Sequence, residues 1–383
     1  MRYDFFVTVW GRNFVEKYEN FSLASQLFSR NIPALAERCP ITYSIYTDRA
    51  SEGDLAETRR RLGKYADVRL IFFEDLPHGG GRLSDAVVNS DPALVKHNVQ
   101  GITANHLMAE AAKEPESAVV LLDSDFIFSN GSLIAMHAHR EAGARAVAVM
   151  FARLSTEGAA SPLAQAIGRA GDEGLDGPAL VRLGLAHPHP IARRFFFDAE
   201  DFSAYPTQIN WPVGEAGFVT HCFFPHPLMV TPGAAYYSST MDYEVLLRSA
   251  DDEAIHLVRS SDDIMLCKMT NDAYLADQDH LGAHGIERMA HFAINNTNLR
   301  HRLFMAQPIR FSAGGAEHVW AEIEGQSTAF VEAIYKGAEL LLANLEPGDA
   351  KSLVYLKSFL GPIEDYLSPQ QHARMKDRMP PAK

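Results

Sequence analysis

The first 125 residues alternate short, continuous apolar runs with polar or amphipathic stretches, and this pattern constrains the fold more than any other feature. The apolar runs cover residues 5–10, 41–46, 68–73 and 118–122. Uninterrupted runs of this length are typical of strands buried on both faces of a parallel sheet, and the stretches between them are suited to crossover helices. The pattern therefore predicts a β-α-β-α-β-α-β unit within an α/β domain of the nucleotide-binding type.

The end of the fourth apolar run carries the clearest chemical signal in this unit. No GxGxxG follows the first strand and no GxxxxGK[ST] occurs, so the sequence shows neither a dinucleotide fingerprint nor a P-loop. Instead, the fourth run ends on Asp123-Ser124-Asp125. Ligands of open α/β sheets gather at the carboxyl ends of strands, and carboxylates suit Mg²⁺ or Mn²⁺ bound together with substrate phosphates. We expect one aspartate to bind the cation and the other to reach a ribose or a metal-bound water.

Net charge, cysteine spacing and the lengths of the apolar runs indicate which partners and which cellular compartment to expect. Among 383 residues, 35 Lys and Arg stand against 48 Asp and Glu, and the net charge of −13 disfavours a nucleic-acid partner. The three cysteines, Cys39, Cys222 and Cys267, form no CxxC pair, which argues against a structural zinc site or a disulfide framework. Neither a signal peptide nor an apolar run of about 20 residues is evident, so we expect no transmembrane segment and a cytoplasmic protein.

The sequence pattern of the remaining residues predicts that the α/β domain is followed by a mainly helical region. Residues 152–210 are weakly patterned and rich in Gly, Ala and Pro, as in an insertion, and a further strand is expected over residues 218–230. From about residue 264 the pattern becomes mainly helical. We therefore expect an α/β domain over residues 1–262 and a mainly helical C-terminal region over residues 263–383.

The aspartate pair after an apolar strand near residue 120, with the first strand at the N-terminus, resembles the glycosyltransferases of the GT-A fold. The resemblance covers residues 3–150 well and residues 218–258 loosely. It implies a Rossmann-like, mixed but mainly parallel sheet flanked by helices, with a helical C-terminal extension. It also implies a hexosyltransferase-like enzyme (EC 2.4) that uses Mn²⁺ or Mg²⁺ and a nucleotide-diphosphate sugar donor. The acceptor would be a glycan, lipid or protein, and by analogy the setting would be bacterial surface glycan assembly.

The resemblance gives the strand ends of the first half a role in nucleoside binding. Thr8, Val9 and Trp10, at the end of the first strand, would line the nucleobase pocket. Asp48, which ends the second strand, would contact the base or the ribose. A core position for Trp10 and a turn position for Asp48 are the alternatives that the residue types also allow.

The resemblance also assigns the donor phosphates and the metal. Asp123 and Asp125 would be metal ligands, with Asp123 and Ser124 also contacting the donor. Lys96, on the helix before the aspartate-bearing strand, would face the phosphates, and Arg82 after the glycine run is an alternative.

The second half supplies candidates for the remaining roles. His301 is the candidate third metal ligand, and His226 is its rival. Asp242 or Glu244, in the first turn of a helix capped by Ser238 to Thr240, is the candidate general base that would deprotonate an acceptor hydroxyl. Asp262, at another acidic helix start, is an alternative base.

Two other functions fit parts of the same pattern. A nucleotidyltransferase that makes sugar nucleotides shares the topology, but it usually has a glycine-rich, basic loop directly after the first strand, where this chain has Trp10-Gly11-Arg12-Asn13-Phe14. A non-catalytic nucleotide-sugar-binding protein would bind a donor without turnover, and the intact aspartate pair argues against it. The sequence indicates no oligomeric state.

Overall fold

The chain forms two compact units, each assembled from segments that are distant in the sequence. The computed structural model describes residues 1–89, 92–114, 116–233, 241–274, 280–282, 284–297 and 299–343. The first unit contains residues 1–190, 225–274 and 311–314, and the second contains residues 191–224, 275–310 and those from 315 onward. The division predicted between residues 262 and 263 stays a prediction.

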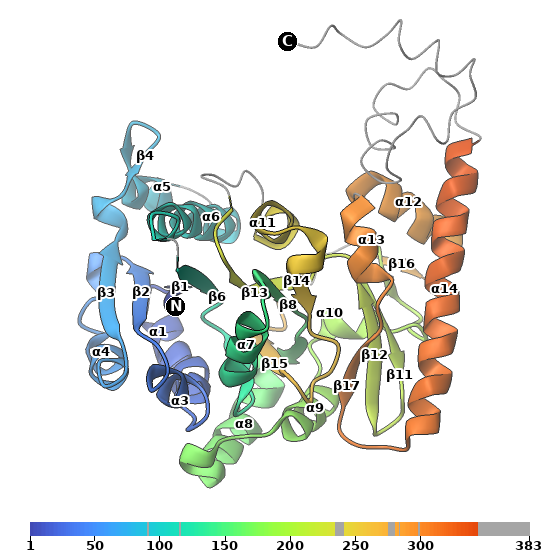
Figure 1. Ribbon diagram of the computed structural model, residues 1–383, viewed down its shortest axis with the longest axis horizontal. Helices are drawn as coiled ribbons and strands as arrows, with labels where there is room; N and C mark the ends of the chain where they lie inside the picture. The colour runs from blue at the N-terminus through green and yellow to red at the C-terminus, as the bar shows by residue number, and fades with distance from the viewer. Residues whose placement is uncertain are drawn as a thin grey trace, which may run out of the picture. The chain divides into compact units, whose positions relative to one another are not determined.

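A seven-stranded sheet forms the centre of the first unit (Figure 1). In sheet order its strands are β14 (Ile255–Leu257), β8 (Ala146–Val149), β13 (His226–Val230), β6 (Ser117–Leu122), β1 (Arg2–Thr8), β2 (Ile41–Thr47) and β3 (Asp67–Phe72). β13 is antiparallel to β6 and β8, whereas the other neighbouring strands are parallel. This mixed, mainly parallel sheet flanked by helices confirms the predicted α/β class and is consistent with a GT-A-like fold.

The inner strands are buried because they lie between layers of helices. Every residue of β2, β6 and β13 is buried, and β1 is buried from Tyr3 to Val7. The Phe5 and Tyr43 rings stack at 5.5 Å between neighbouring strands. The helices of this unit are α1 (Arg12–Lys17), α2 (Leu23–Gln26), α3 (Ile32–Ala36), α4 (Ala56–Leu62), α5 (Leu83–Asn89), α6 (Pro92–Ala111), α7 (Ser132–Glu141), α8 (Thr156–Ala170), α9 (Gly177–Ala186) and α11 (Met241–Ser249). Among them, α6 packs on β1 and β6.

A smaller sheet of the first unit was not predicted. It has the order β7 (Phe126–Phe128), β15 (Leu266–Thr270), β9 (Ala152–Ser155). β15 is antiparallel to β7 and parallel to β9. β15 is thus a strand within the stretch predicted to be mainly helical from about residue 264, and Lys268 interrupts its apolar pattern.

The strand expected over residues 218–230 is two strands that belong to different sheets. β12 (Gly217–Cys222) pairs with β11 (Gln208–Pro212), whereas β13 joins the central sheet. Pro225 and Pro227 flank the start of β13, and proline has no N–H to donate to a ladder. The chain therefore leaves one sheet and enters another at this point.

The second unit has its own apolar core. It includes buried Trp211, Phe223, Met289 and Ile334. Its elements include β10 (Phe202–Ser203), β11, β12, β16 (His280–Gly282), α12 (Ile286–Asn296), α13 (Leu299–Met305) and α14 (Glu317–Ala343). The long helix α14 confirms the predicted helical C-terminal extension, and residues 344–383 of that region lie outside the described residues. Among the described helices, none is both long and apolar enough to cross a bilayer.

Candidate functional site

Asp123, Ser124 and Asp125 lie at the carboxyl end of β6, in the middle of the central sheet. The chain then enters β7 at Phe126, so the motif is held by a strand on each side. Phe126 is paired with Lys268 in the register of β7 and β15, and the backbone oxygen of Asp125 accepts a hydrogen bond from Met269 N at 3.0 Å. The small sheet thus positions β15 beside the two aspartates.

Asp123 is neutralised by a lysine that is distant in the sequence. Lys268 forms an ion pair with Asp123 Oδ2, and Gln100 Nε2 on α6 donates a hydrogen bond to Oδ1. The side chains of Asp123 and Lys268 are only 14% and 21% exposed. Burial acts to raise the pKa of Asp123, but the positive charges of Lys268 and His226 and the two hydrogen bonds outweigh it, so this pKa is lowered. Asp123 is therefore held as a carboxylate.

Asp125 differs from Asp123 in its surroundings. Among the residues that the structure describes, none donates a hydrogen bond to its carboxylate or forms an ion pair with it. Burial raises its pKa, the negative charge of Asp123 adds to this, and the positive charges of Lys268, Lys17 and Arg153 oppose it. Asp125 thus presents carboxylate oxygens that a cation can bind.

Four cationic side chains from four elements act on the two carboxylates, and we call Lys17, Lys96, Arg153 and Lys268 the cation cluster. Lys17, at the end of α1, donates from Nζ to Thr156 Oγ1 at 2.8 Å and to Met269 O at 3.2 Å. Its pKa is lowered by burial, although the charges of Asp125 and Glu157 oppose the shift. Lys17 is therefore held close to the motif by neutral acceptors.

The other two members of the cation cluster are held by β15 and the segment after it. Lys96 Nζ lies 3.8 Å from the centroid of the Tyr274 ring, and Arg153 Nη1 donates to Thr270 Oγ1 at 2.9 Å. Burial and then the charge of Lys268 lower the pKa of Lys96. The positive side chains thus repel one another, and an added anion would relieve that repulsion.

The donor set suits a hard divalent cation. Asp125 offers carboxylate oxygens that have no hydrogen-bond or ion-pair partner among the described residues, and Asp123 offers a second carboxylate whose present partner, Lys268, is itself a cation. Oxygen ligands of this kind are those that Mg²⁺ and Mn²⁺ take. The aspartate pair therefore fits the cation that the sequence implied.

The predicted nucleoside-binding residues have structural partners in this fold. Thr8 Oγ1 lies 2.9 Å from Thr103 Oγ1, and the Trp10 ring meets the Phe73 ring edge-on at 5.3 Å. Asp48 Oδ1 accepts a hydrogen bond from Ser51 N at 3.0 Å and caps a short helix. The cap matches the alternative interpretation of Asp48 as a turn residue, whereas Trp10 is only partly buried. Their binding of a nucleoside, together with that of Val9, stays a prediction.

The histidine candidates belong to different units. His301 is a buried residue of α13 in the second unit, next to the Phe224 ring. His226 belongs to the first unit, where its Nε2 lies 2.8 Å from Leu121 O. A metal-binding role stays a prediction for both.

The candidate bases are at the start of α11. This helix begins at Met241, so Asp242 and Glu244 lie in its first turn. Their side chains, and the predicted cap from Ser238 to Thr240, lie outside the part of the chain that the structure describes. The general-base role therefore stays a prediction for both residues.

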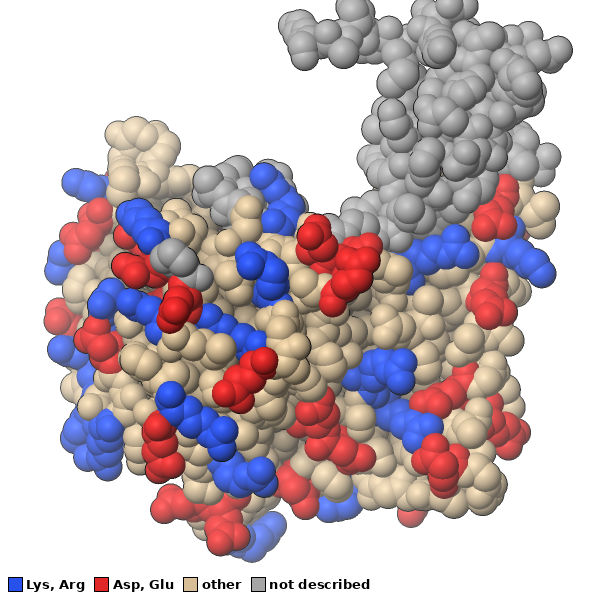
Figure 2. Space-filling view, in the orientation of Figure 1, with Lys and Arg blue, Asp and Glu red and all other residues tan. Residues whose placement is uncertain are grey.

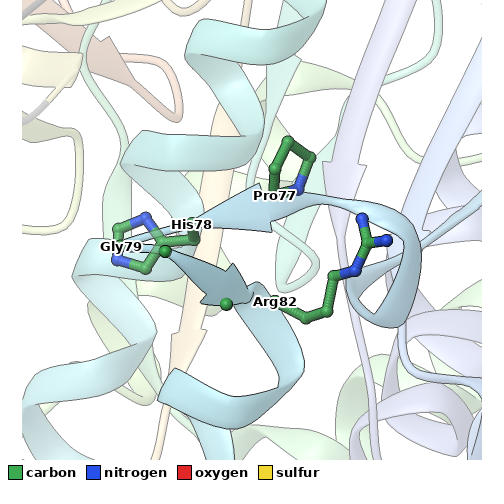
Figure 3. A pocket seen from close by; sticks show the side chains of 6 residues that line it. Pro77, His78, Gly79 and Arg82 are labelled. Carbon is green, nitrogen blue, oxygen red and sulfur yellow. The ribbon is translucent and has the colours of Figure 1, made fainter.

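Arg82 has local partners in a surface hairpin. It lies on β5 (Gly81–Arg82), which pairs with β4 (Pro77–His78) around a shallow pocket. Figure 3 shows the Arg82 and His78 side chains directed to opposite sides of this hairpin. Arg82 Nη1 donates to Asp75 O at 3.1 Å, and its backbone N–H donates to Asp85. Among the described residues, no hydrogen bond or ion pair joins Arg82 to the aspartate motif.

Sequence reasoning missed Lys268, Lys17, Arg153 and Gln100. A lysine inside the otherwise apolar run Leu-Cys-Lys-Met-Thr was the one available signal, because a buried strand carries a charge only where a partner neutralises it. The excess of positive side chains belongs to the surroundings of the aspartate motif. On the face shown in Figure 2, acidic and basic side chains are intermixed over the described surface.

Comparisons with known proteins give weak similarities in structure only. No family profile and no curated protein matches the sequence. Among solved structures, S. aureus TarS 1–349 is 10% identical with a TM-score of 0.34, over 99% of this chain and 91% of that one. The longer structure of S. aureus TarS is 10% identical with a TM-score of 0.30, over 99% of this chain and 53% of that one. Mouse xyloside xylosyltransferase 1 is 12% identical with a TM-score of 0.24, over 46% of this chain and 63% of that one.

The ion pair between Lys268 and Asp123 generates the first prediction. Lys268→Met removes the cation and leaves a largely buried carboxylate, which should lower the free energy of unfolding at pH 7 by about 3 kcal/mol. In the wild type, the lowered pKa of Asp123 contributes stability above the unfolded pKa, and this contribution is lost as the pH falls through the folded pKa. The deficit of Lys268→Met should therefore be largest near neutral pH and shrink in acid, as measured by urea unfolding.

Lys96→Met is the matched control for this prediction. It removes a member of the cation cluster whose contact is with an aromatic ring, so it should cost about 1 kcal/mol or less. Equal and pH-independent losses in the two variants would contradict the stabilising role of the Lys268 ion pair.

Proposed function

We propose that this protein is a metal-dependent glycosyltransferase that transfers a sugar from a nucleotide-diphosphate sugar to a glycan, lipid or protein acceptor. The observation that carries the proposal is the pair of unequal carboxylates at the carboxyl end of the central strand, with the cation cluster around it. A ligand matched to this site carries several negative charges and binds a divalent cation. A nucleoside diphosphate has both properties.

Asp123 and Asp125 would hold Mn²⁺ or Mg²⁺. When bound, such an ion neutralises the charge that develops on a diphosphate leaving group. Lys17, Lys96 and Arg153 would bind the phosphate oxygens, because each is a cation that acts electrostatically on Asp125. Anion binding would replace the mutual repulsion of these side chains with attraction.

The nucleoside and the acceptor would lie to either side of the diphosphate. We assign the nucleobase to Thr8, Val9 and Trp10, at the carboxyl end of β1, and the ribose to Asp48 and Ser124. β1 and β2 are the neighbours of β6 on one side of the sheet, which supports this assignment.

The acceptor hydroxyl would need a base. We assign this role to Asp242, with Glu244 as its neighbour in the same helical turn, because a carboxylate near a helix N-terminus stays ionised and can accept a proton. His301 would complete the metal shell. Bacterial surface glycan assembly in the cytoplasm is the setting that we propose, and the three buried free cysteines are compatible with a reducing compartment.

The segment that follows β1, residues 10–14, supports a nucleotidyltransferase less well. The one cationic side chain in this segment, Arg12, forms an ion pair with Glu16. The N–H of Gly11 donates to Ser51 Oγ at 2.8 Å, and Trp10 packs on Phe73. A loop whose groups already have these partners is poorly suited to holding a triphosphate. A non-catalytic donor-binding protein is distinguished by the absence of turnover.

Asp125→Asn tests the metal site. A ligand at a hundredfold excess over its Kd stabilises the native state by about 2.7 kcal/mol, so thermal-shift measurements should detect nucleoside diphosphates. We expect a larger shift with Mn²⁺ than without it in the wild type, and we expect Asp125→Asn to lose this difference because the amide cannot balance the ion's charge. Asp172→Asn, at an exposed acid outside the site, should behave like the wild type. A variant at position 125 that keeps the full Mn²⁺ effect would contradict the assignment.

Asp242→Asn tests the base. The amide keeps the shape of the side chain and removes its basicity, so sugar transfer should fall by a factor of about 10² to 10⁴ in a product assay. Binding of the donor and the melting temperature should stay near those of the wild type. Transfer at a wild-type rate would move the role to Glu244 or Asp262, which Glu244→Gln and Asp262→Asn would then distinguish.

A further inference from the structure

We propose that His139, His256 and Asp263 bind a zinc ion at a site separate from the aspartate motif. His139 lies in the last turn of α7, His256 lies on β14 at the edge of the central sheet, and Asp263 lies in the turn before β15. All three belong to the first unit. The inference does not depend on the proposed function.

The ligand atoms of the three residues converge. His139 Nε2 is 2.7 Å and His256 Nε2 is 3.9 Å from Asp263 Oδ2, and all three ligand atoms lie within 4.8 Å of one another. Zinc bonds of about 2.0–2.2 Å in tetrahedral geometry place neighbouring ligand atoms about 3.3 Å apart. The two observed distances lie on either side of that value, and the stacked rings would turn apart so that both Nε2 lone pairs point at one ion.

The arrangement of the two imidazole rings is the second observation. The rings of His139 and His256 are stacked, with centroids 3.6 Å apart and an angle of 20° between their planes. A hydrogen bond to Asp263 accounts for the His139 ring, but 3.9 Å is too long for a hydrogen bond from His256. Both Nε2 atoms have Asp263 Oδ2 as their nearest carboxylate oxygen, so two nitrogen donors and one oxygen donor converge on one point.

The chemistry of the ligands selects the metal. Two imidazole nitrogens and one carboxylate oxygen are typical of zinc, whereas the oxygen-only donors of Asp123 and Asp125 are typical of Mg²⁺ or Mn²⁺. The side chains of His139, His256 and Asp263 are 23%, 38% and 35% exposed, so an ion can enter from solvent and a water can take the fourth position. An ion here would link α7, β14 and the turn that leads into β15.

Metal titration of the tag-free, full-length chain tests the site. We expect one Zn²⁺ per chain in isothermal titration calorimetry, and tetrahedral Co²⁺ absorption bands when Co²⁺ replaces it. His139→Gln, His256→Gln and Asp263→Asn should each weaken Zn²⁺ binding at least tenfold. His318→Gln, which removes an exposed imidazole elsewhere, and Asp125→Asn, which removes a ligand of the aspartate motif, should bind like the wild type.

The thermal melts of the metal-free variants separate loss of the site from loss of the fold. Weakened binding in His256→Gln and Asp263→Asn, with metal-free melts close to that of the wild type, would support the site. Absence of Zn²⁺ binding by the wild type would overturn the proposal. Unchanged affinity in His256→Gln and Asp263→Asn would overturn it as well.

Discussion

The contact between Lys268 and Asp123 is the interaction on which the arrangement of the first unit depends. Two carboxylates separated by one residue lie at the end of a buried strand, where removing them from water is costly and their charges repel. The two carboxylates differ: Asp123 is bound by a lysine and an amide, whereas Asp125 has no such partner within the described ranges and has a raised pKa. The small sheet of β7, β15 and β9 brings the lysine to the motif from 145 residues away in the sequence.

The strands that build the central sheet were predictable because burial on both faces requires continuous apolar runs. β2, β3 and β6 lie within one residue of the predicted runs, whereas β1 begins three residues before its run and ends two residues before the run does. The position of the aspartates followed directly from the end of β6. β15 was not predictable in the same way. In the sequence, Lys268 resembles a solvent-facing residue. Its pairing with the buried Asp123 joins segments that are distant in the chain, so the local pattern does not reveal it.

Contacts between distant segments also limit how much of the candidate site the sequence could predict. Asp123, Asp125 and Lys96 could be selected from local pattern and resemblance, because each lies on or beside an element that the sequence predicts. Lys17 and Arg153 could not, since their relation to Asp125 arises only when α1 and β9 pack near β6. Trp10 and Asp48 show the opposite case, in which a packing contact and a helix cap account for the residue types without a ligand.

The two groups of metal-ligating side chains differ in chemistry as well as in position along the chain. The aspartate motif offers oxygen donors within a field of positive side chains, which suits a cation that arrives with a phosphate-bearing ligand. The cluster of His139, His256 and Asp263 offers mainly nitrogen donors from three packed segments, which suits an ion that stays with the protein. The preference for Zn²⁺ over Mg²⁺ should therefore be greater at the histidine-containing cluster than at the aspartate motif.

The most direct test of the central claim is a crystal structure of the chain grown with Mn²⁺ and a nucleoside diphosphate, with the ion located from its anomalous scattering. We expect a manganese peak bonded to a carboxylate oxygen of Asp125, with diphosphate oxygens bound to the ion and to side chains of the cation cluster. A bound nucleoside diphosphate whose manganese peak contacts neither Asp123 nor Asp125 would contradict it.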